Sequence, residues 1–313
     1  MRRIPKTLIF AVILAIAAFI VAAVFYTRSP VLVVAEQSFI ELYGKERLKN
    51  ETFLSSVLMF RLLKTVVIAN DASDDVVPFA IKEISAKPYC VLFPLRFVRS
   101  AQFYREQNPE IPVVVLEGRY PEIENPAENA LGADKSEYFI YKTDMNGDLY
   151  NLGLAISALK HEEEPKNDDS APETEKNDKI AIFLDRNLPQ ANDIFLKSLY
   201  DNGVLTETQF FYYFSQSMDK TDFTCVILVG LGYEYLDKKT GVPVIAFTCI
   251  DPFFLPSDVV MVVNDSPWAQ ARQTVRMVGA GEKNGLIKSE FLVLNKKKFD
   301  KDVVALIKKQ GKM

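Results

Sequence analysis

The stretch "YKTDMNGDLYNLGLAISALK", residues 141–160, begins like a calcium-binding loop and ends like an amphipathic helix. Oxygen-bearing residues alternate from Asp144 onward, as calcium ligands do. A helix–loop–helix calcium site, however, has glycine at the sixth position of its loop and a bidentate glutamate at the twelfth. Counted from Asp144, the glycine is the fourth residue (Gly147) and the twelfth is Ala155. This stretch therefore needs a role other than calcium binding.

The same stretch fits the end of a strand followed by the start of a helix. "EYFIYKTD" (137–144) is a strand-like run, and Gly147 suits a tight turn into the helix. From there an apolar stripe recurs at helical spacing: Leu149, Leu152, Ile156 and Leu159. Asp144 lies where the strand becomes the helix, and both a helix cap and a ligand contact are open for it.

The rest of the chain repeats strands and helices in alternation. Before this stretch, the expected strands are 31–36, 65–71, 89–94, 111–118 and 137–144, and the expected helices are 45–64, 77–85 and 100–107. After it, the expected strands are 179–185, 208–214, 224–230, 242–247, 258–263 and 287–294, and the expected helices are 189–203, 266–278 and 299–309. Fully apolar strands alternating with helices predict parallel sheets covered on both faces.

Two groups of apolar residues, one in a helix and one in a loop, lead to expectations about packing. The helix expected at 45–64 has apolar residues at roughly helical spacing, namely Leu48, Phe53, Val57, Phe60 and Leu63. Phe253 and Phe254 lie in a loop bounded by prolines, where we expect them to anchor the loop to the core.

The first 26 residues differ from the rest of the chain. The basic "MRRIPK" precedes about twenty uncharged residues, 7–26, enough for a helix across a hydrocarbon core about 30 Å thick. Cleavable signal peptides usually have shorter apolar regions, although Val21, Ala22 and Ala23 form an acceptable cleavage site. We expect a single-pass transmembrane anchor, with a cleaved leader as the alternative.

Positive charge is concentrated on one side of this apolar run. Arg2, Arg3 and Lys6 precede it, and only Arg28 follows closely. The positive-inside rule then leaves the short N-terminus in the cytoplasm and places the body outside it. The predicted location is the cell membrane with a periplasmic body, or the periplasm if the leader is removed.

Composition excludes several classes of function. A net charge of -4 and a pI near 5.4 argue against a nucleic-acid partner. His161 is the single histidine, which makes a histidine-based zinc site or a catalytic triad improbable. Cys90, Cys225 and Cys249 each lie in an apolar run and are expected as buried thiols. We find no catalytic constellation, cofactor fingerprint or metal cluster, so no enzyme activity and no cofactor is expected.

Residues 161–178, "HEEEPKNDDSAPETEKND", have no apolar periodicity and are rich in Glu, Asp, Pro, Ser and Asn. This composition predicts a disordered acidic insertion. A solvated tether and an acidic docking site are both open for it, and the tether is the simpler interpretation.

The order of elements resembles the type I periplasmic binding-protein fold, shared by solute receptors of ABC transporters and by the ligand-sensing cores of LacI-type repressors. Two phrases carry the resemblance: "TDMNG" at 143–147, where a strand leaves a first lobe, and "NDSPW" at 264–268, where the chain returns to it. The resemblance covers about residues 31–295 and implies two lobes joined by hinge crossovers. The DNA-binding segment of the repressors is absent, and the acidic insertion is not typical of the family.

The resemblance implies a division of the chain into two doubly wound parallel-sheet lobes. After the anchor (1–28), the first lobe would comprise 29–142 plus 264–286. The second lobe would comprise 143–263 plus 287–313, with the acidic insertion 161–178 inside it.

Candidate ligand contacts follow from a geometric rule: in open α/β sheets, ligands bind beyond the carboxyl ends of the strands. The rule and the crossovers select nine residues: Gln37, Asp71 and Glu117 from the first lobe, Asp185, Tyr233 and Asp251 from the second, and Asp144, Asp265 and Trp268 from the crossovers. Polar groups beside aromatic faces suit a sugar or a nucleoside. Each acidic residue taken singly also fits a cap or a surface charge, and Trp268 fits helix packing equally well.

Three functions are compatible with this sequence. The first is a membrane-anchored receptor that captures a small polar solute, sugar- or nucleoside-like, for an ABC permease or a membrane sensor. The second is a structural or interaction protein that keeps the fold without a ligand. The third, an exported enzyme, needs a nucleophile or metal cluster that the sequence does not offer. The receptor is the leading hypothesis.

Overall fold

The computed structural model describes residues 27–118, 130–159, 180–183, 196–201, 210–212, 223–230, 240–299 and 301–310. The predicted anchor, the acidic insertion, Asp185 and Tyr233 lie outside these ranges. Within them, no helix combines the length and the apolar character that crossing a bilayer requires.

The described strands form two sheets of six. The first has the order β11-β5-β4-β3-β1-β2, and all of its pairings are parallel. Its strands are β1 (Val31–Glu36), β2 (Leu63–Ile68), β3 (Cys90–Pro94), β4 (Val113–Leu116), β5 (Phe139–Thr143) and β11 (Asn284–Ile287). The second has the order β12-β10-β9-β8-β6-β7, in which only β12 is antiparallel. Its strands are β6 (Ile180–Phe183), β7 (Phe210–Tyr212), β8 (Cys225–Val229), β9 (Val244–Phe247), β10 (Val259–Asn264) and β12 (Glu290–Val293).

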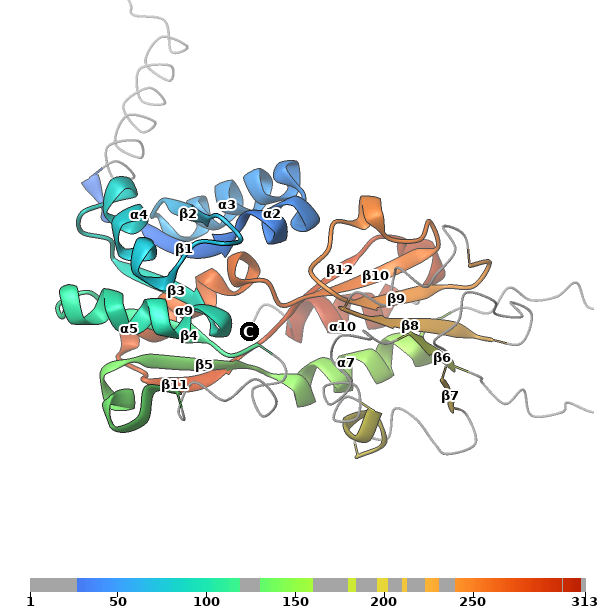
Figure 1. Ribbon diagram of the computed structural model, residues 1–313. Helices are drawn as coiled ribbons and strands as arrows, with labels where there is room; N and C mark the ends of the chain where they lie inside the picture. Colours follow the sequence, from blue (N-terminus) through green and yellow to red (C-terminus); the bar gives the residue numbers. More distant parts are fainter. Residues whose placement is uncertain are drawn as a thin grey trace, which may run out of the picture.

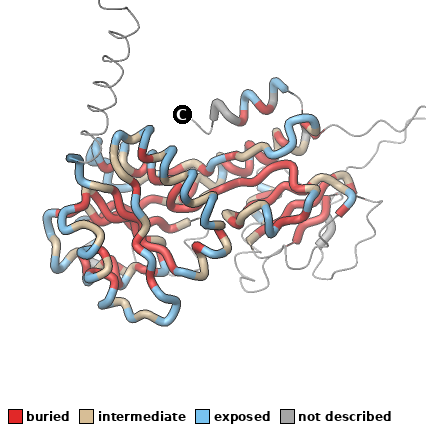
Figure 2. Tube along the Cα trace, turned by 90° about the horizontal axis from the view of Figure 1, so that it is seen from above, coloured by how far each residue is buried: buried red, intermediate tan, exposed pale blue. Residues whose placement is uncertain are grey.

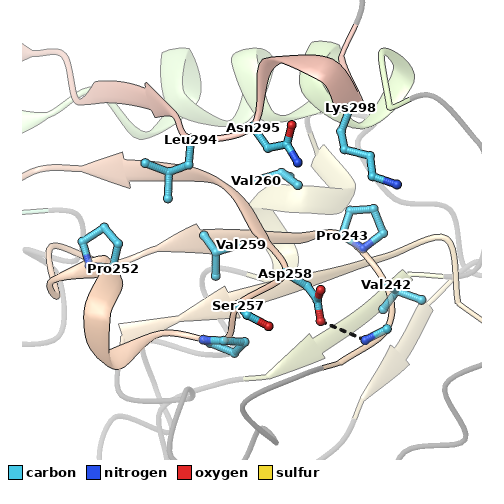
Figure 3. A pocket seen from close by; sticks show the side chains of 12 residues that line it. Val242, Pro243, Pro252, Ser257, Asp258, Val259, Val260, Leu294, Asn295 and Lys298 are labelled. Atoms are coloured by element: carbon cyan, nitrogen blue, oxygen red, sulfur yellow. Dashed lines mark hydrogen bonds between the residues drawn. The ribbon is translucent and has the colours of Figure 1, made fainter.

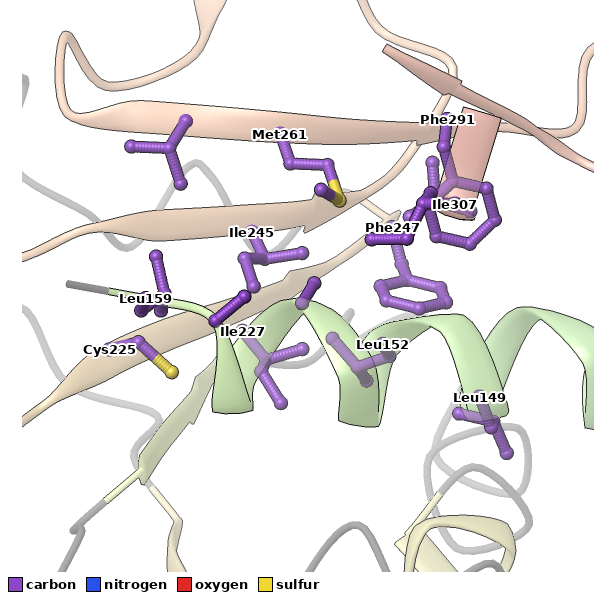
Figure 4. Close-up of a cluster of buried hydrophobic side chains, with 14 of the residues drawn as sticks. Leu149, Leu152, Leu159, Cys225, Ile227, Ile245, Phe247, Met261, Phe291 and Ile307 are labelled. Carbon is purple, nitrogen blue, oxygen red and sulfur yellow. The ribbon is translucent and has the colours of Figure 1, made fainter. Parts of the chain in front are cut away.

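Helices cover both faces of the first sheet. One face packs against α2 (Gln37–Tyr43), α3 (Lys45–Met59) and α9 (Pro267–Ala280), and the other against α4 (Val77–Ile84) and α5 (Val98–Gln107). One face of the second sheet packs against α7 (Met145–Ser157) and α10 (Lys301–Gln310), as Figure 4 shows for α7. Short 3-10 helices complete the described elements: η1 (Asp74–Val76), η2 (Leu95–Phe97), η3 (Gly132–Glu137), η6 (Pro252–Phe254) and η7 (Lys296–Lys298).

The two sheets form two lobes that lie side by side, and the chain passes between them three times (Figure 1). It leaves the first lobe between β5 and α7, returns between β10 and α9, and leaves again between β11 and β12. In Figure 2 the buried backbone forms the centre of each lobe and exposed backbone surrounds it. This arrangement is the predicted α/β two-lobe fold with parallel sheets.

Two element boundaries differ from the sequence prediction. The helix expected to reach residue 64 ends at Met59, and strand β2 begins at Leu63 because the chain must turn there to pair with β1. The strand expected at 287–294 is the shorter β12 of the second lobe, and it is preceded by an unexpected strand, β11, in the first lobe. Strand β11 is short and contains Gly285, so it lacks a strong apolar run.

The exposure of two apolar groups also differs from expectation. Phe253 is 87% exposed and Phe254 is 46% exposed, so neither anchors its loop to the core. On α3, Phe53 and Val57 are exposed, whereas Ser56 is buried and donates to the backbone carbonyl of Thr52 at 2.6 Å. The apolar residues of this helix therefore face mainly away from the sheet.

Candidate functional site

Charged residues of alternating sign lie along the carboxyl edge of the first sheet. Because β5, β4, β3 and β1 are neighbours in that order, their ends place four side chains in a row. The row consists of Lys142, Glu117, Arg96 and Glu36. The chain crosses from β5 to the second lobe at this edge, so the row lies at the end of the first sheet where that crossover begins.

The row is organised as two ion pairs. Lys142 Nζ lies 3.3 Å from Glu117 Oε2, and the carboxylate is buried while the lysine is 40% exposed. Glu36, also buried, pairs with the guanidinium of Arg96, which remains 55% exposed. Buried carboxylates are held by half-exposed cations, which leaves cationic donors at the surface of the edge.

A second group of contacts bridges the lobes directly. Arg47, on α3 of the first lobe, donates from Nη1 to the backbone carbonyls of Cys249 (3.1 Å) and Ile250 (2.9 Å) in the second. The backbone N–H of Asp251 donates to the carbonyl of Leu42 at 2.9 Å. The turn between α2 and α3 therefore rests against the loop that follows β9.

Beneath this bridge lies a buried polar network. The Tyr43 hydroxyl and the Asn264 amide (3.2 Å) both donate to the Glu51 carboxylate, and the Ser266 hydroxyl lies 3.2 Å from the same tyrosine oxygen. Arg47 pairs with Glu51 at 3.4 Å. Burial raises the pKa of Glu51 above its usual value and outweighs the donors that lower it. Asn264 and Ser266 belong to the crossover between β10 and α9, so the network joins α3 to a hinge.

Hydrogen bonds also join the three crossovers to one another. Gln270 Nε2 donates to Thr143 Oγ1 at 2.9 Å, and the backbone N–H of Asp144 donates to the carbonyl of Ile287 at 2.8 Å. The Ser289 hydroxyl donates to the Asp148 carboxylate in the interior. The three crossovers therefore lie side by side and are joined by hydrogen bonds.

Two cavities among the described residues are candidates for a ligand site. One of about 150 Å³ lies between the lobes, lined by Phe39, Leu42, Tyr43, Gly230, Thr248, Cys249 and Ile250. It is smaller than ligand pockets usually are, about 300–1,000 Å³. The other, of about 460 Å³, lies around the beginnings of β9 and β10 (Figure 3). The Asp258 carboxylate in its lining accepts hydrogen bonds from the backbone N–H groups of Thr240 (2.7 Å) and Gly241 (3.0 Å). Since ligands of open α/β sheets bind at the carboxyl ends, the smaller cavity is the better candidate.

The predicted residues of the first lobe lie at the expected edge, with different roles. Glu117 belongs to the charged row. Gln37 and Asp71 are exposed, and Gln37 donates to Glu41 at 3.2 Å. Asp144 caps α7 by accepting from the N–H of Gly147 at 3.0 Å. A side chain at Gly147 would collide with that carboxylate, so the glycine serves the cap rather than a turn.

The remaining predicted residues divide into three groups. Asp251 caps the 3-10 helix η6 by accepting from the N–H of Phe253 at 2.9 Å, and Asp265 is half-buried between β10 and α9. Trp268 is fully buried, donates from Nε1 to Thr65 at 3.0 Å and packs against aromatic rings of α2, so it holds α9 to the first lobe. Asp185 and Tyr233 lie outside the described residues, and their proposed contacts stay predictions.

Among the residues of the site that the sequence analysis did not select are four charged ones: Arg96, Lys142, Arg47 and Glu51. Arg96 follows β3 directly, so the rule about carboxyl ends could have found it. Lys142 lies within a strand, and nothing in its position suggested a role at the edge. Arg47 and Glu51 lie in an ordinary charged helix, and only the docking of α3 against the second lobe distinguishes them.

Within the described ranges, no group of three histidine, cysteine, aspartate or glutamate side chains is placed to hold a metal ion. All three cysteines are free thiols.

Solved structures share this fold. An ABC-transporter solute-binding protein from Conexibacter woesei aligns over 91% of this chain and 95% of its own, with a TM-score of 0.55 and 9% identity. A transcriptional activator of the comK gene from Bacillus halodurans aligns over 90% and 95%, with a TM-score of 0.50 and 10% identity. No protein-family model and no curated protein matches the sequence. The chain has the type I periplasmic binding-protein fold, which non-enzymatic binding proteins and regulators share.

Proposed function

We propose that this protein is an extracytoplasmic receptor, anchored in the membrane by residues 7–26, that binds a small polar solute between its lobes. The closed form would then be recognised by an ABC permease or a membrane sensor. The fold supports the general class, since the Conexibacter woesei protein that shares it is named as a solute-binding protein of an ABC transporter system. Fold alone does not settle function, so the proposal depends on the site.

The charged row at the edge of the first sheet carries the proposal. Arg96 and Lys142 are half-exposed, and each is held in place by a buried carboxylate. Guanidinium and ammonium groups offer several N–H donors to hydroxyl or carbonyl oxygens of a ligand. Aromatic and apolar groups of the cavity between the lobes, including Phe39, would cover a less polar face. This combination suits a sugar- or nucleoside-like solute.

Closure of the lobes would couple binding to recognition by a partner. The three crossovers form a continuous hinge, and hinge closure around a ligand is a common form of conformational change. A ligand that contacts both lobes would bind the closed form more tightly than the open form. The closed form would then be stabilised by the difference between the two binding free energies.

A ligand-free interaction protein is the second candidate, and a specific observation favours it. Arg47 and Asp251 already join the lobes by direct hydrogen bonds, and the cavity beside them is only about 150 Å³. In this case the two lobes contact each other without a ligand, and partners recognise the outer surface of the protein.

A thermal-shift screen of the full chain in lipid nanodiscs separates the two candidates. Sugars, nucleosides and amino acids are added one class at a time. The receptor proposal predicts that one class raises the unfolding temperature. A ligand at 100 times its Kd stabilises the folded state by about 2.7 kcal/mol. If no class changes the unfolding temperature, the ligand-free candidate stands.

Two matched variants make this screen specific for the charged row. Arg96→Ala removes a half-exposed cation of the row and should abolish the ligand-induced shift. Arg105→Ala removes an arginine that pairs with Glu137 at 3.3 Å on the outer helix α5, away from the row, and should leave the shift intact. Equal responses of the two variants would place the ligand elsewhere.

A further inference from the structure

The last two turns of helix α3 and the residue that follows them expose five large apolar side chains together. Phe53, Leu54, Val57, Leu58 and Phe60 are between 41% and 70% exposed. Residues three, four and seven apart share one side of a helix, so these five form a continuous apolar face. We call it the α3 apolar face. Monomeric soluble proteins rarely leave such a patch without a function.

The backbone at the end of α3 holds one of these side chains in an unfavourable conformation. Phe60 has φ +50, the only positive φ of a non-glycine residue among those the structure describes. Its N–H bonds to the carbonyls of Ser56 and Val57 to close the helix. Glycine or asparagine is usual at this position, because the left-handed conformation is unfavourable for other residues. An exposed phenylalanine kept there is a second sign that the surface has a role.

The α3 apolar face lies next to the point where the chain enters the first lobe. Arg61, directly after Phe60, donates to the carbonyl of Ser29 at 3.1 Å and stacks on the ring of Tyr89 at 3.9 Å. The N–H of Tyr89 in turn donates to the carbonyl of Pro30 at 2.8 Å. The entering segment is therefore fixed beside the end of α3.

Only a short connection separates this point from the apolar run 7–26. Residues 27–30 lie between that run and the start of β1 at Val31. A chain of this length spans at most about 14 Å. If the run is anchored in a bilayer, the amino edge of the first sheet must lie close to the bilayer surface.

We propose that the α3 apolar face inserts into the interfacial region of the bilayer that holds the anchor. At a rise of 1.5 Å per residue the face runs along about 10 Å of the helix. Helices with one apolar face lie in the plane of the interface with that face buried about 5–10 Å. The first half of α3, "KERLKNET", is polar and points toward the second lobe. Arg28, Lys64 and Lys87 are exposed near the entering segment, where anionic headgroups would attract them.

This placement determines the orientation of the whole protein. The entering segment lies at the amino ends of the strands of the first sheet, and the charged row lies at their carboxyl ends. With the amino edge against the bilayer, the space between the lobes faces away from it. The inference depends on the membrane anchor of the proposed function and not on solute capture.

Fluorescence quenching by brominated lipids tests the proposal. The full chain is reconstituted in vesicles containing phosphatidylglycerol and brominated phosphatidylcholine, with Leu58→Trp or Phe53→Trp as the reporter. Both positions are exposed, so neither substitution disturbs the core. The single native tryptophan, Trp268, is fully buried and supplies a constant background. Phe253→Trp, on an exposed residue of the second lobe, is the matched control.

The expected result is a loss of emission from both α3 reporters in brominated vesicles, with no change in the control. Unquenched, water-exposed emission from the α3 reporters would overturn the proposal. Blue-shifted emission without quenching would also overturn it, because a second copy or another protein would then cover the face. Release of the chain from vesicles by an alkaline wash would overturn the anchor itself. The ligand screen stays interpretable in each case, because it measures binding at the charged row and not at the α3 apolar face.

Discussion

The two lobes repeat one strand order but present different chemistry to each other. The described edge of the first lobe offers side chains: the charged row, and Arg47 at the bridge. The described edge of the second lobe offers mainly backbone, since Cys249 and Ile250 accept through their carbonyls and Asp251 donates through its N–H. The same topology therefore does not imply the same role, and the contact between the lobes depends on the side chains of one of them.

The largest expected difference is in the free energy of unfolding that is lost when an aromatic residue of each lobe is replaced by alanine. Trp268→Ala removes a fully buried ring from the first-lobe core and should reduce the free energy of unfolding by about 3–5 kcal/mol. Phe253→Ala, at an 87% exposed position of the second lobe, should change it by less than about 0.5 kcal/mol. Urea unfolding of both variants measures the two values. Similar values would show that the loop of Phe253 packs more tightly than its exposure indicates.

A smaller effect should distinguish side-chain from backbone contributions at the bridge. Arg47→Ala leaves the buried Glu51 carboxylate without its cation and two carbonyls without their donor, which should cost about 3 kcal/mol. Cys249→Ala keeps the accepting carbonyl and should cost less than about 1 kcal/mol. Small-angle scattering should also show a larger radius of gyration for Arg47→Ala alone. An unchanged radius would mean that the hinge, not the bridge, holds the lobes together.

The smallest effect concerns the pH dependence of the same network. Burial raises the pKa of Glu51 in the folded state, so the protonated form is favoured by folding. The stability that this group contributes is fully present below its unfolded pKa of 4.5 and is lost as the pH rises through the raised value. Glu51→Gln cannot titrate at this position and serves as the reference. The free energy of unfolding is measured with urea for the parent and for Glu51→Gln at pH 5 and pH 8. The parent's value should exceed that of the variant by more at pH 5 than at pH 8. A difference that stays constant with pH would contradict this expectation.

Much of the fold could be predicted from the sequence, because parallel strands buried on both faces appear as short apolar runs. Strand β11 was missed because it is an edge strand with exposed positions and an internal glycine. The phrases at 143–147 and 264–268 marked two crossovers correctly, since each combines a strand end with a helix cap. The third crossover carries no such phrase; the division expected between residues 286 and 287 lies next to it, since β11 ends at Ile287 and β12 begins at Glu290.

The site was less predictable than the fold. The rule about carboxyl ends located Glu117 at its edge, yet it could not show which side chains turn inward as caps, as Asp144 and Asp251 do. Arg47 was missed because its partners are backbone atoms some 200 residues away in the sequence. Such contacts leave no pattern in the chain, because any residue supplies a carbonyl.

The third crossover has a consequence for how the protein is made. The first sheet receives its last strand at Asn284–Ile287 of a chain of 313 residues, long after β5 is complete at Thr143. At a synthesis rate of about 5–20 residues per second, the ribosome needs on the order of 10 s to reach that strand. During this interval β5 has an unpaired edge, which is a site for wrong pairing. Neither sheet has all of its described strands before residues 284–293 are synthesised, so a chaperone that shields the edge of β5 should increase the yield of folded protein.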